Sequence, residues 1–183
     1  MNSDAVTTFF ALLALTCDAF VLAALLARAT RRRTAWWDSL VTMIGPSGLA
    51  LAAVIALTAT LGSLYLSEVA HFPPCRMCWY QRTAMYPLAL LGSVAAVRRD
   101  VGFALYGRVL AAVGAAFSLY HVLLERFPGL ETGACEVDNP CSIVWVRHFG
   151  VFTIPFMAGS GFVAIITAYA LAAAADRPEE TSA

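Results

Sequence analysis

Long apolar runs separated by short polar segments make up most of the chain. Five of them are long enough to form helices that cross a bilayer, which takes about 20 mostly apolar residues: roughly 5–27, 44–67, 79–97, 101–124 and 151–175. The third and fourth runs contain Arg82 and Arg108, each within one or two turns of a helix end, where a long side chain can reach the interface. The pattern therefore predicts an all-α bundle of five membrane-spanning helices.

Composition agrees with a membrane protein and argues against a soluble one. The chain is 60% hydrophobic and 13% charged, with a mean hydropathy of +0.73 and no lysine. A soluble protein of 183 residues would need far more polar surface to cover its core. The first run is also not flanked like a signal peptide, because positive charge follows it, at Arg28 and Arg31, and does not precede it. We expect it to be a retained helix.

The arginines favour one side of the predicted bundle. Seven lie in segments that follow the first, third and fifth runs: Arg28, Arg31, Arg32, Arg33, Arg98, Arg99 and Arg177. Three lie in the opposite loops: Arg76, Arg126 and Arg147. Because cytoplasmic loops carry the excess of positive charge, the pattern predicts a multi-pass protein of the cytoplasmic (inner) membrane. Its N-terminus would lie outside and its C-terminus in the cytoplasm.

Four of the five cysteines form two pairs in the predicted outer loops, where disulfides persist: Cys75 with Cys78, and Cys135 with Cys141. Two pairs facing one compartment indicate a protein that passes disulfides along the membrane surface. Cys17 lies within the first run, and we expect it to behave as a small apolar residue. Its neighbour Asp18 is an acid at membrane depth, which usually signals function, although we expect a packing role.

The C-x-x-C pair is predicted to open the third helix, because Pro73 and Pro74 bar a helix before it. Free backbone N–H groups and the positive end of the helix dipole favour a thiolate there. Arg82 lies four residues beyond Cys78, on the same helix face. It could donate hydrogen bonds to a carbonyl oxygen of a lipid-soluble quinone. An arginine that reaches out to lipid phosphate is the alternative, and spacing alone does not separate the two.

The second pair lies in the segment 131–147, which we expect to be a loop because glycine, asparagine and proline interrupt it. A disulfide between Cys135 and Cys141 in an exposed loop could be reached by another protein. His121, near the outer end of the fourth helix, should lie at a depth similar to that of Arg82. It could donate to a quinone oxygen or carry a proton, or simply bond to a neighbouring helix.

Two other uses of the cysteines remain open at this point. Four cysteines could bind zinc tetrahedrally, but the second spacing is loose for a zinc site and the location is oxidising. The pairs could also be structural disulfides of a non-catalytic membrane subunit. That alternative does not account for an arginine one turn beyond a thiol at a helix start.

The chain resembles the disulfide bond formation protein B (DsbB) family, especially its BdbC-type branch with a short second loop. The matching motifs are P-C-R-M-C-W-Y-Q-R at 74–82, M-Y-P-L at 85–88, Y-H at 120–121, P-C at 140–141 after Cys135, and F-G-V-F-T-I-P-F at 149–156. A vitamin K epoxide reductase-like enzyme is a less suitable match, since its C-x-x-C follows the loop pair in chain order. Here the C-x-x-C comes first.

The resemblance implies a four-helix bundle that holds ubiquinone or menaquinone near its outer surface and needs no metal or nucleic acid. Cys75 and Cys78 would be reoxidised by quinone, with Cys78 facing the ring and with Arg82 and His121 at the quinone site. Cys135 and Cys141 would meet a soluble thioredoxin-fold oxidase similar to DsbA or BdbD, with Cys135 forming the mixed disulfide.

The first helix departs from the family pattern. We expect three parts: an extra N-terminal transmembrane helix with an arginine-rich linker at 1–43, a DsbB-like membrane domain at 44–175, and a cytoplasmic tail at 176–183. An added crossing moves only the N-terminus and leaves the cysteines on the same side.

Overall fold

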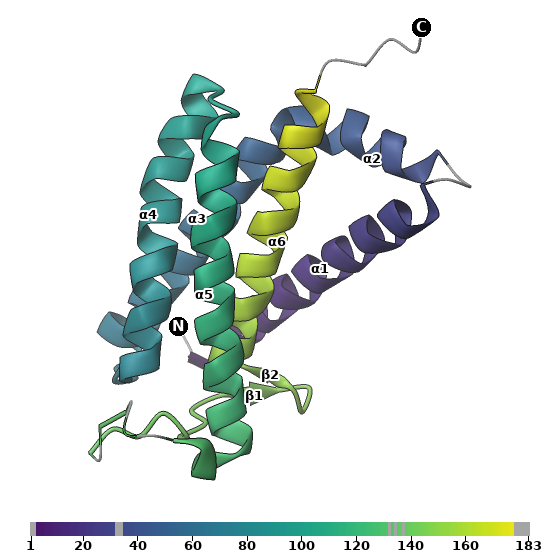
Figure 1. Cartoon of the computed structure of the whole chain (residues 1–183). Coiled ribbons are helices and arrows are strands. Elements are labelled where there is room, and N and C mark those ends of the chain that lie inside the picture. The colour runs from purple at the N-terminus through teal and green to yellow at the C-terminus, as the bar shows by residue number, and fades with distance from the viewer. Residues whose placement is uncertain (1–2, 32–34, 132, 134, 137, 178–183) are drawn as a thin grey trace, which may run out of the picture.

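The computed structural model describes residues 3–31, 35–131, 133, 135–136 and 138–177. Long helices dominate this part of the chain (Figure 1): α1 (Ser3–Thr30), α3 (Gly48–Leu64), α4 (Arg76–Arg98), α5 (Phe103–Arg126) and α6 (Ile154–Ala175). Helices α3 to α6 pack together as a bundle, while α1 contacts α6 from outside it. The predicted all-α helical bundle is confirmed.

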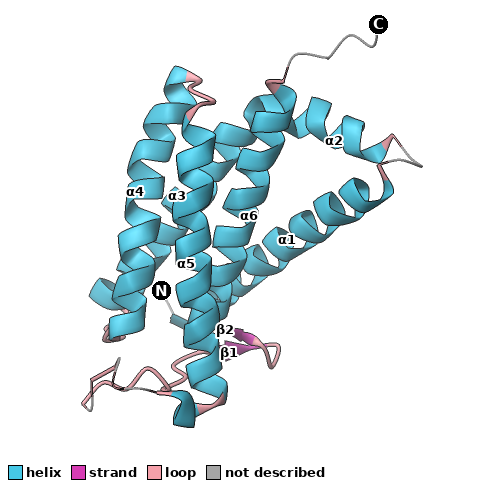
Figure 2. Cartoon of the chain, viewed as in Figure 1, coloured by secondary structure: helices cyan, strands magenta, loops and turns pink. Residues whose placement is uncertain are grey.

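Shorter elements connect these helices (Figure 2): α2 (Trp36–Ile44), the 3₁₀ turns η1 (Gly45–Ser47) and η3 (Pro128–Leu130), the π-helical turn η2 (Tyr65–Val69), and the antiparallel strands β1 (Arg147–His148) and β2 (Phe152–Thr153). The linker expected before residue 44 therefore contains a helix. Its apolar residues let α2 contact both α1 and α6.

Apolar length supports an integral membrane bundle. Four helical segments in the described chain are long and apolar enough to cross a membrane: Ser3–Thr30, Trp36–Val69, Phe103–Arg126 and Ile154–Ala175. Helix α4 has 23 residues but is more polar, because Arg76, Gln81 and Arg82 occupy its first two turns. It still runs beside α3 and α5 along the bundle (Figure 1).

Helix α6 supplies the centre of the core. Phe162, Ile165 and Tyr169 are completely buried. The rings of Phe162 and Tyr169 lie against Gly114 and Gly107 of α5, where a Cβ atom would have no room. Small residues of this kind let membrane helices approach closely, and α5 is thereby fixed against α6.

The two ends of the bundle differ in chemistry. The start of α4 with its cysteines, the loop after α5, the β1–β2 hairpin and the start of α1 lie at one end (Figure 1). The α4–α5 turn with Arg98 and Arg99, and the end of α6, lie at the other. The four paired cysteines are thus all at the first of these ends.

Candidate functional site

The first cysteine pair opens α4, as predicted. Cys75 is the N-cap residue, and its Sγ accepts a hydrogen bond from the backbone N–H of Cys78 at 3.4 Å. An unpaired amide at a helix start and the helix dipole both stabilise negative charge on this sulfur. The sequence folds this way because Pro73 and Pro74 hold the chain extended until Cys75.

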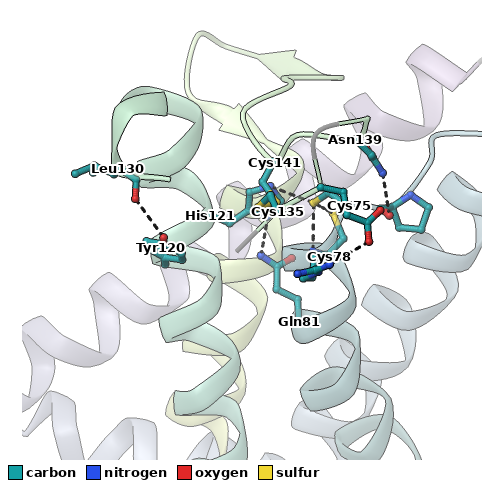
Figure 3. Close-up of a disulfide and its surroundings, with 12 residues drawn as sticks. Cys75, Cys78, Gln81, Tyr120, His121, Leu130, Cys135, Asn139 and Cys141 are labelled. Carbon is teal, nitrogen blue, oxygen red and sulfur yellow. Dashed lines mark hydrogen bonds and ion pairs between the residues drawn. A yellow bond between two sulfur atoms is a disulfide. The ribbon is translucent and has the colours of Figure 1, made fainter. Parts of the chain in front are cut away.

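Two side chains complete the surroundings of the Cys75 thiol. The Sγ atoms of Cys75 and Cys78 are 3.0 Å apart, and His121 Nε2 of α5 lies 3.6 Å from Cys75 Sγ. The pKa of Cys75 is lowered to about 4, above all by the hydrogen bond from Cys78 and also by His121, while burial acts to raise it. His121 Nδ1 in turn faces Gln81 Nε2 at 3.3 Å, which fixes the imidazole (Figure 3).

We expect the reduced protein to keep a thiolate at Cys75 down to about pH 4. Because the pKa lies below the ordinary value of 9.0, the thiolate is complete at neutral pH and is lost only as the pH falls past about 4. The ultraviolet absorbance of the thiolate, taken as the difference from Cys75→Ser, measures this transition. His121→Ala should move the midpoint upward; a wild-type midpoint near 9.0 would contradict the assignment.

The second pair forms a disulfide, Cys135–Cys141, and the described residues between 131 and 146 form no helix or strand, as expected. The expected exposure of this disulfide is wrong, because both cysteines are buried and pack with Cys75. Asn139 Nδ2 donates to the carbonyl oxygen of Pro74 at 3.3 Å, which holds this loop against the first pair (Figure 3). An ion pair between Arg76 and Glu136, at 3.3 Å, spans the same contact. Both partners are exposed, so the ion pair contributes little. Cys135 is only 8% exposed and Cys141 1%, so the loop must move before another protein can reach this disulfide.

A smaller cavity joins the two cysteine pairs. Its walls include Cys75, Cys78, His121 and Cys141, together with Glu125 one turn beyond His121 on α5. Cys135 does not line it. Cys141 is therefore the loop cysteine that shares this cavity with the first pair, while Cys135 lies outside the cavity but packs in the same buried cluster as Cys75.

A larger cavity, of about 140 Å³, is also lined by Cys78. Its walls are mostly apolar and come from α1, α3, η2, the segment 72–74, α4, α6 and Trp145. Arg82 lines it and is only 8% exposed. Its Nε and Nη2 donate to Oγ and O of Ser63, both at 2.9 Å, and its guanidinium lies 5.0 Å from the Trp79 ring centroid.

This geometry separates the alternatives for Arg82. A nearly buried guanidinium anchored to Ser63 of α3 does not reach lipid phosphate. Of the five N–H donors of an arginine, Ser63 occupies two. The remaining donors can bind an acceptor in the larger cavity. Tyr86, one turn further along α4, lines the same cavity, and its buried hydroxyl has no hydrogen-bond partner.

The larger cavity fits a quinone by its chemistry. Its apolar walls suit the ring and tail, and a guanidinium with free donors and an unpartnered phenol suit the carbonyl oxygens. Cys78 lies at the same wall. His121, which was grouped with Arg82 at the sequence level, lines only the smaller cavity and touches Cys75 instead.

The structure rules out a zinc site made of all four paired cysteines. Cys135 and Cys141 are joined to each other and offer no thiolate. In the described chain, one group of donors could hold a metal ion, namely Cys75, Cys78 and His121, whose ligand atoms lie within 4.8 Å of one another. This set exists only while the first pair is reduced.

Four residues of the site were not predicted from the sequence as functional: Ser63, Gln81, Tyr86 and Glu125. Helical spacing could have found Tyr86, which is four residues beyond Arg82, and Glu125, which is four beyond His121. One carboxylate oxygen of Glu125 is buried without a hydrogen-bond partner. Ser63 and Gln81 carry no such signal.

Comparison with known proteins identifies the family of the chain. The model of the family "Disulfide bond formation protein DsbB" matches residues 46–176. The chain is 42% identical over 120 residues to a "Probable disulfide formation protein" of Oceanobacillus iheyensis, covering 64% of this chain and 83% of that one. It is 43% identical over 114 residues to "Disulfide bond formation protein C" of Bacillus subtilis, covering 62% and 83%. No solved structure matches.

Proposed function

Because the chain belongs to the disulfide bond formation protein DsbB family, we propose that it is a membrane thiol-disulfide oxidoreductase that transfers electrons from a soluble dithiol protein to quinone. The soluble protein would be a thioredoxin-fold oxidase of the DsbA or BdbD kind. Its reoxidation would sustain disulfide formation in exported proteins. Membership of this family also argues against a vitamin K epoxide reductase-like enzyme.

One observation carries the proposal: Cys78 lines both cavities. On one side it shares the smaller cavity with Cys141 of the loop disulfide. On the other it shares the larger cavity with Arg82. A sulfur at this position can accept electrons from the loop side and release them on the quinone side. A pair of purely structural disulfides would need neither cavity.

The first half of the reaction takes place at the loop. A thiolate of the reduced partner attacks Cys135, the Cys135–Cys141 bond breaks, and Cys141 leaves as a thiolate. The partner's second thiol then attacks the mixed disulfide, which frees Cys135 and leaves the partner oxidised. Two electrons and two protons have now moved from the partner to the loop pair.

The second half transfers these electrons to the first pair. Cys141 attacks Cys75 of the Cys75–Cys78 disulfide and releases Cys78; Cys135 then attacks Cys141, which restores the loop disulfide and releases Cys75. The low pKa of Cys75 makes it a good leaving group and stabilises the reduced first pair. His121 and Glu125 line the cavity in which protons are exchanged and can carry them.

The quinone would accept two electrons and two protons. The Cys75–Cys78 disulfide re-forms when the quinone is reduced. Arg82 and Tyr86 bind and polarise its carbonyl oxygens from α4. Ser63 fixes the guanidinium of Arg82, so that the charge is already in place before electrons arrive. The apolar walls exclude water from the reacting sulfur.

Orientation in the membrane is part of the proposal. The cysteine pairs lie at one end of the bundle, and Arg98, Arg99 and the end of α6 lie at the other (Figure 1). Positive charge favours the cytoplasmic side. This supports an extracytoplasmic site in the cytoplasmic membrane, with the N-terminus outside and the C-terminus inside.

We expect Arg82→Gln to raise the apparent KM for quinone by about 10- to 100-fold, since hydrogen bonds from a charged donor contribute roughly 1.5–3 kcal/mol. Arg82→Lys should recover part of this, because it keeps the charge but loses the forked donors. Quinone-dependent initial rates measure both. Arg108→Gln is the matched control, because Arg108 donates to Ala104 of its own helix and does not line the cavity. An unchanged KM in Arg82→Gln would remove Arg82 from the quinone site.

The proposed function is tested by anaerobic mixing of the detergent-solubilised protein with a reduced thioredoxin-fold dithiol protein and a short-chain quinone. Loss of quinone absorbance, dependent on both cysteine pairs, is the expected result. No quinone reduction, with all four cysteines held in disulfides throughout, would favour a non-catalytic subunit with structural disulfides.

A further inference from the structure

Helix α1 lies outside the family match, which begins at residue 46, yet its first half is firmly attached to the bundle. Thr7 is 2% exposed, and its Oγ1 lies 2.9 Å from His148 Nε2 of β1. Ala11 and Ala14 are buried with Phe152 of β2. Partly buried Phe156 and Met157 of α6 pack against the same group.

The second half of α1 leaves the bundle. Figure 1 shows α1 meeting α6 near the start of α1 and separating from it toward Thr30, where α2 leads the chain back. Only the first half therefore contacts the end of the bundle that holds the cysteines. The first half of α1 and the cysteine site therefore lie at the same end of the bundle.

Phe10 connects this attached half to the larger cavity. It follows Thr7 by three residues and precedes Ala14 by four, so all three share one helix face. Its ring lies directly against Gly62 of α3, where a Cβ atom would collide with the ring. Phe10 also lines the larger cavity together with Arg82 and Cys78.

We infer that α1 forms a wall of the quinone cavity and that Phe10 is a specificity-determining residue for the quinone head group; this rests on the proposed function. The Phe10 ring packs against Gly62 of α3 and lines the same cavity as Met157 and Ala158 of α6. It limits the width available to the ring of the acceptor. An apolar wall discriminates between ligands by the atoms it admits, with about 10- to 200-fold effects per misfitting group.

Phe10→Ala is expected to widen the cavity and shift the preference toward larger head groups. The measurement is kcat/KM for two short-chain acceptors, a benzoquinone and a bicyclic naphthoquinone, with the same reduced dithiol protein as donor. The ratio of the two values should move by about tenfold toward the naphthoquinone. A general loss of folded protein would lower both values together and leave the ratio unchanged.

Leu12→Ala is the matched control, because Leu12 lies on the same helix, is 48% exposed and does not line the cavity. It should leave the ratio as in the wild type. Gly62→Ala gives a second, independent test. In the wild-type background the added methyl group must displace the Phe10 ring, so Gly62→Ala should also shift the ratio. In a Phe10→Ala background the methyl group meets no ring, so Gly62→Ala should add little to the shift.

The outcomes separate this inference from the proposed function. If the wild type reduces quinone and Phe10→Ala keeps the wild-type ratio, α1 is not a specificity wall, and the proposed function stands. Equal shifts in Leu12→Ala and Phe10→Ala would also overturn it. If the wild type reduces neither quinone, the proposed function fails, and the inference fails with it.

Discussion

Replacement of Cys78 by serine is expected to abolish quinone reduction, by at least about 1,000-fold, as removal of a reacting nucleophile does in other enzymes. Cys78 is the sulfur that lines both cavities. Without it the first pair cannot form a disulfide, so electrons from the loop have no route to the acceptor. Quinone absorbance, followed anaerobically with a reduced dithiol protein, measures the loss.

Cys17→Ser is the matched control for this replacement. Cys17 is a free cysteine of α1 that lines neither cavity, so its replacement should leave the rate unchanged. Normal turnover by Cys78→Ser would contradict the mechanism. A clear loss in Cys17→Ser would show that this thiol participates.

Replacement of Cys135 and Cys141 together by serine should have the second largest effect, and a selective one. Oxidation of the protein partner should stop, because the disulfide that it meets is gone. A small dithiol such as dithiothreitol should still drive quinone reduction, because it can reduce the Cys75–Cys78 disulfide directly and does not need the loop disulfide as an intermediate. Replacing both cysteines leaves no stray thiol to form new disulfides.

Ser142→Ala, next to Cys141, controls for disturbance of the loop and should retain partner oxidation. Two results would contradict the assignment of the loop pair. Undiminished partner oxidation in the double variant would mean that the first pair meets the partner directly. Loss of the dithiothreitol-driven reaction would mean that the loop disulfide is structural.

The helices and the first pair could be predicted from the sequence because both depend on local patterns. Apolar length gave the long helices, and the prolines before Cys75 predicted a helix starting there, as the structure has it. The position of Arg82 on the Cys78 face follows from helical spacing. The order in which the two cysteine pairs would transfer electrons came from the family resemblance, because no local pattern contains it.

Other features depend on which helix faces which, and this is set by packing between distant segments. Helix α2 was expected to be part of a linker, because nine residues are too few to read as a separate helix beside a longer apolar run. His121 was placed beside Arg82 by its depth and by the family resemblance, whereas in the structure its Nε2 lies 3.6 Å from Cys75 Sγ. The contact of Phe10 with Gly62 joins segments 52 positions apart (62 − 10), which spacing cannot predict.

A single turnover without quinone shows whether electrons pass from the loop pair to the first pair. The fully oxidised protein is mixed with one equivalent of reduced partner, quenched by alkylation, and its peptides are analysed for modified cysteines. In the alkylated sample we expect modified Cys75 and Cys78 with Cys135–Cys141 still a disulfide. In a parallel sample that is not alkylated, addition of quinone should yield one equivalent of hydroquinone. Alkylation confined to Cys135 and Cys141, with no hydroquinone formed in the parallel sample, would refute this order of electron transfer.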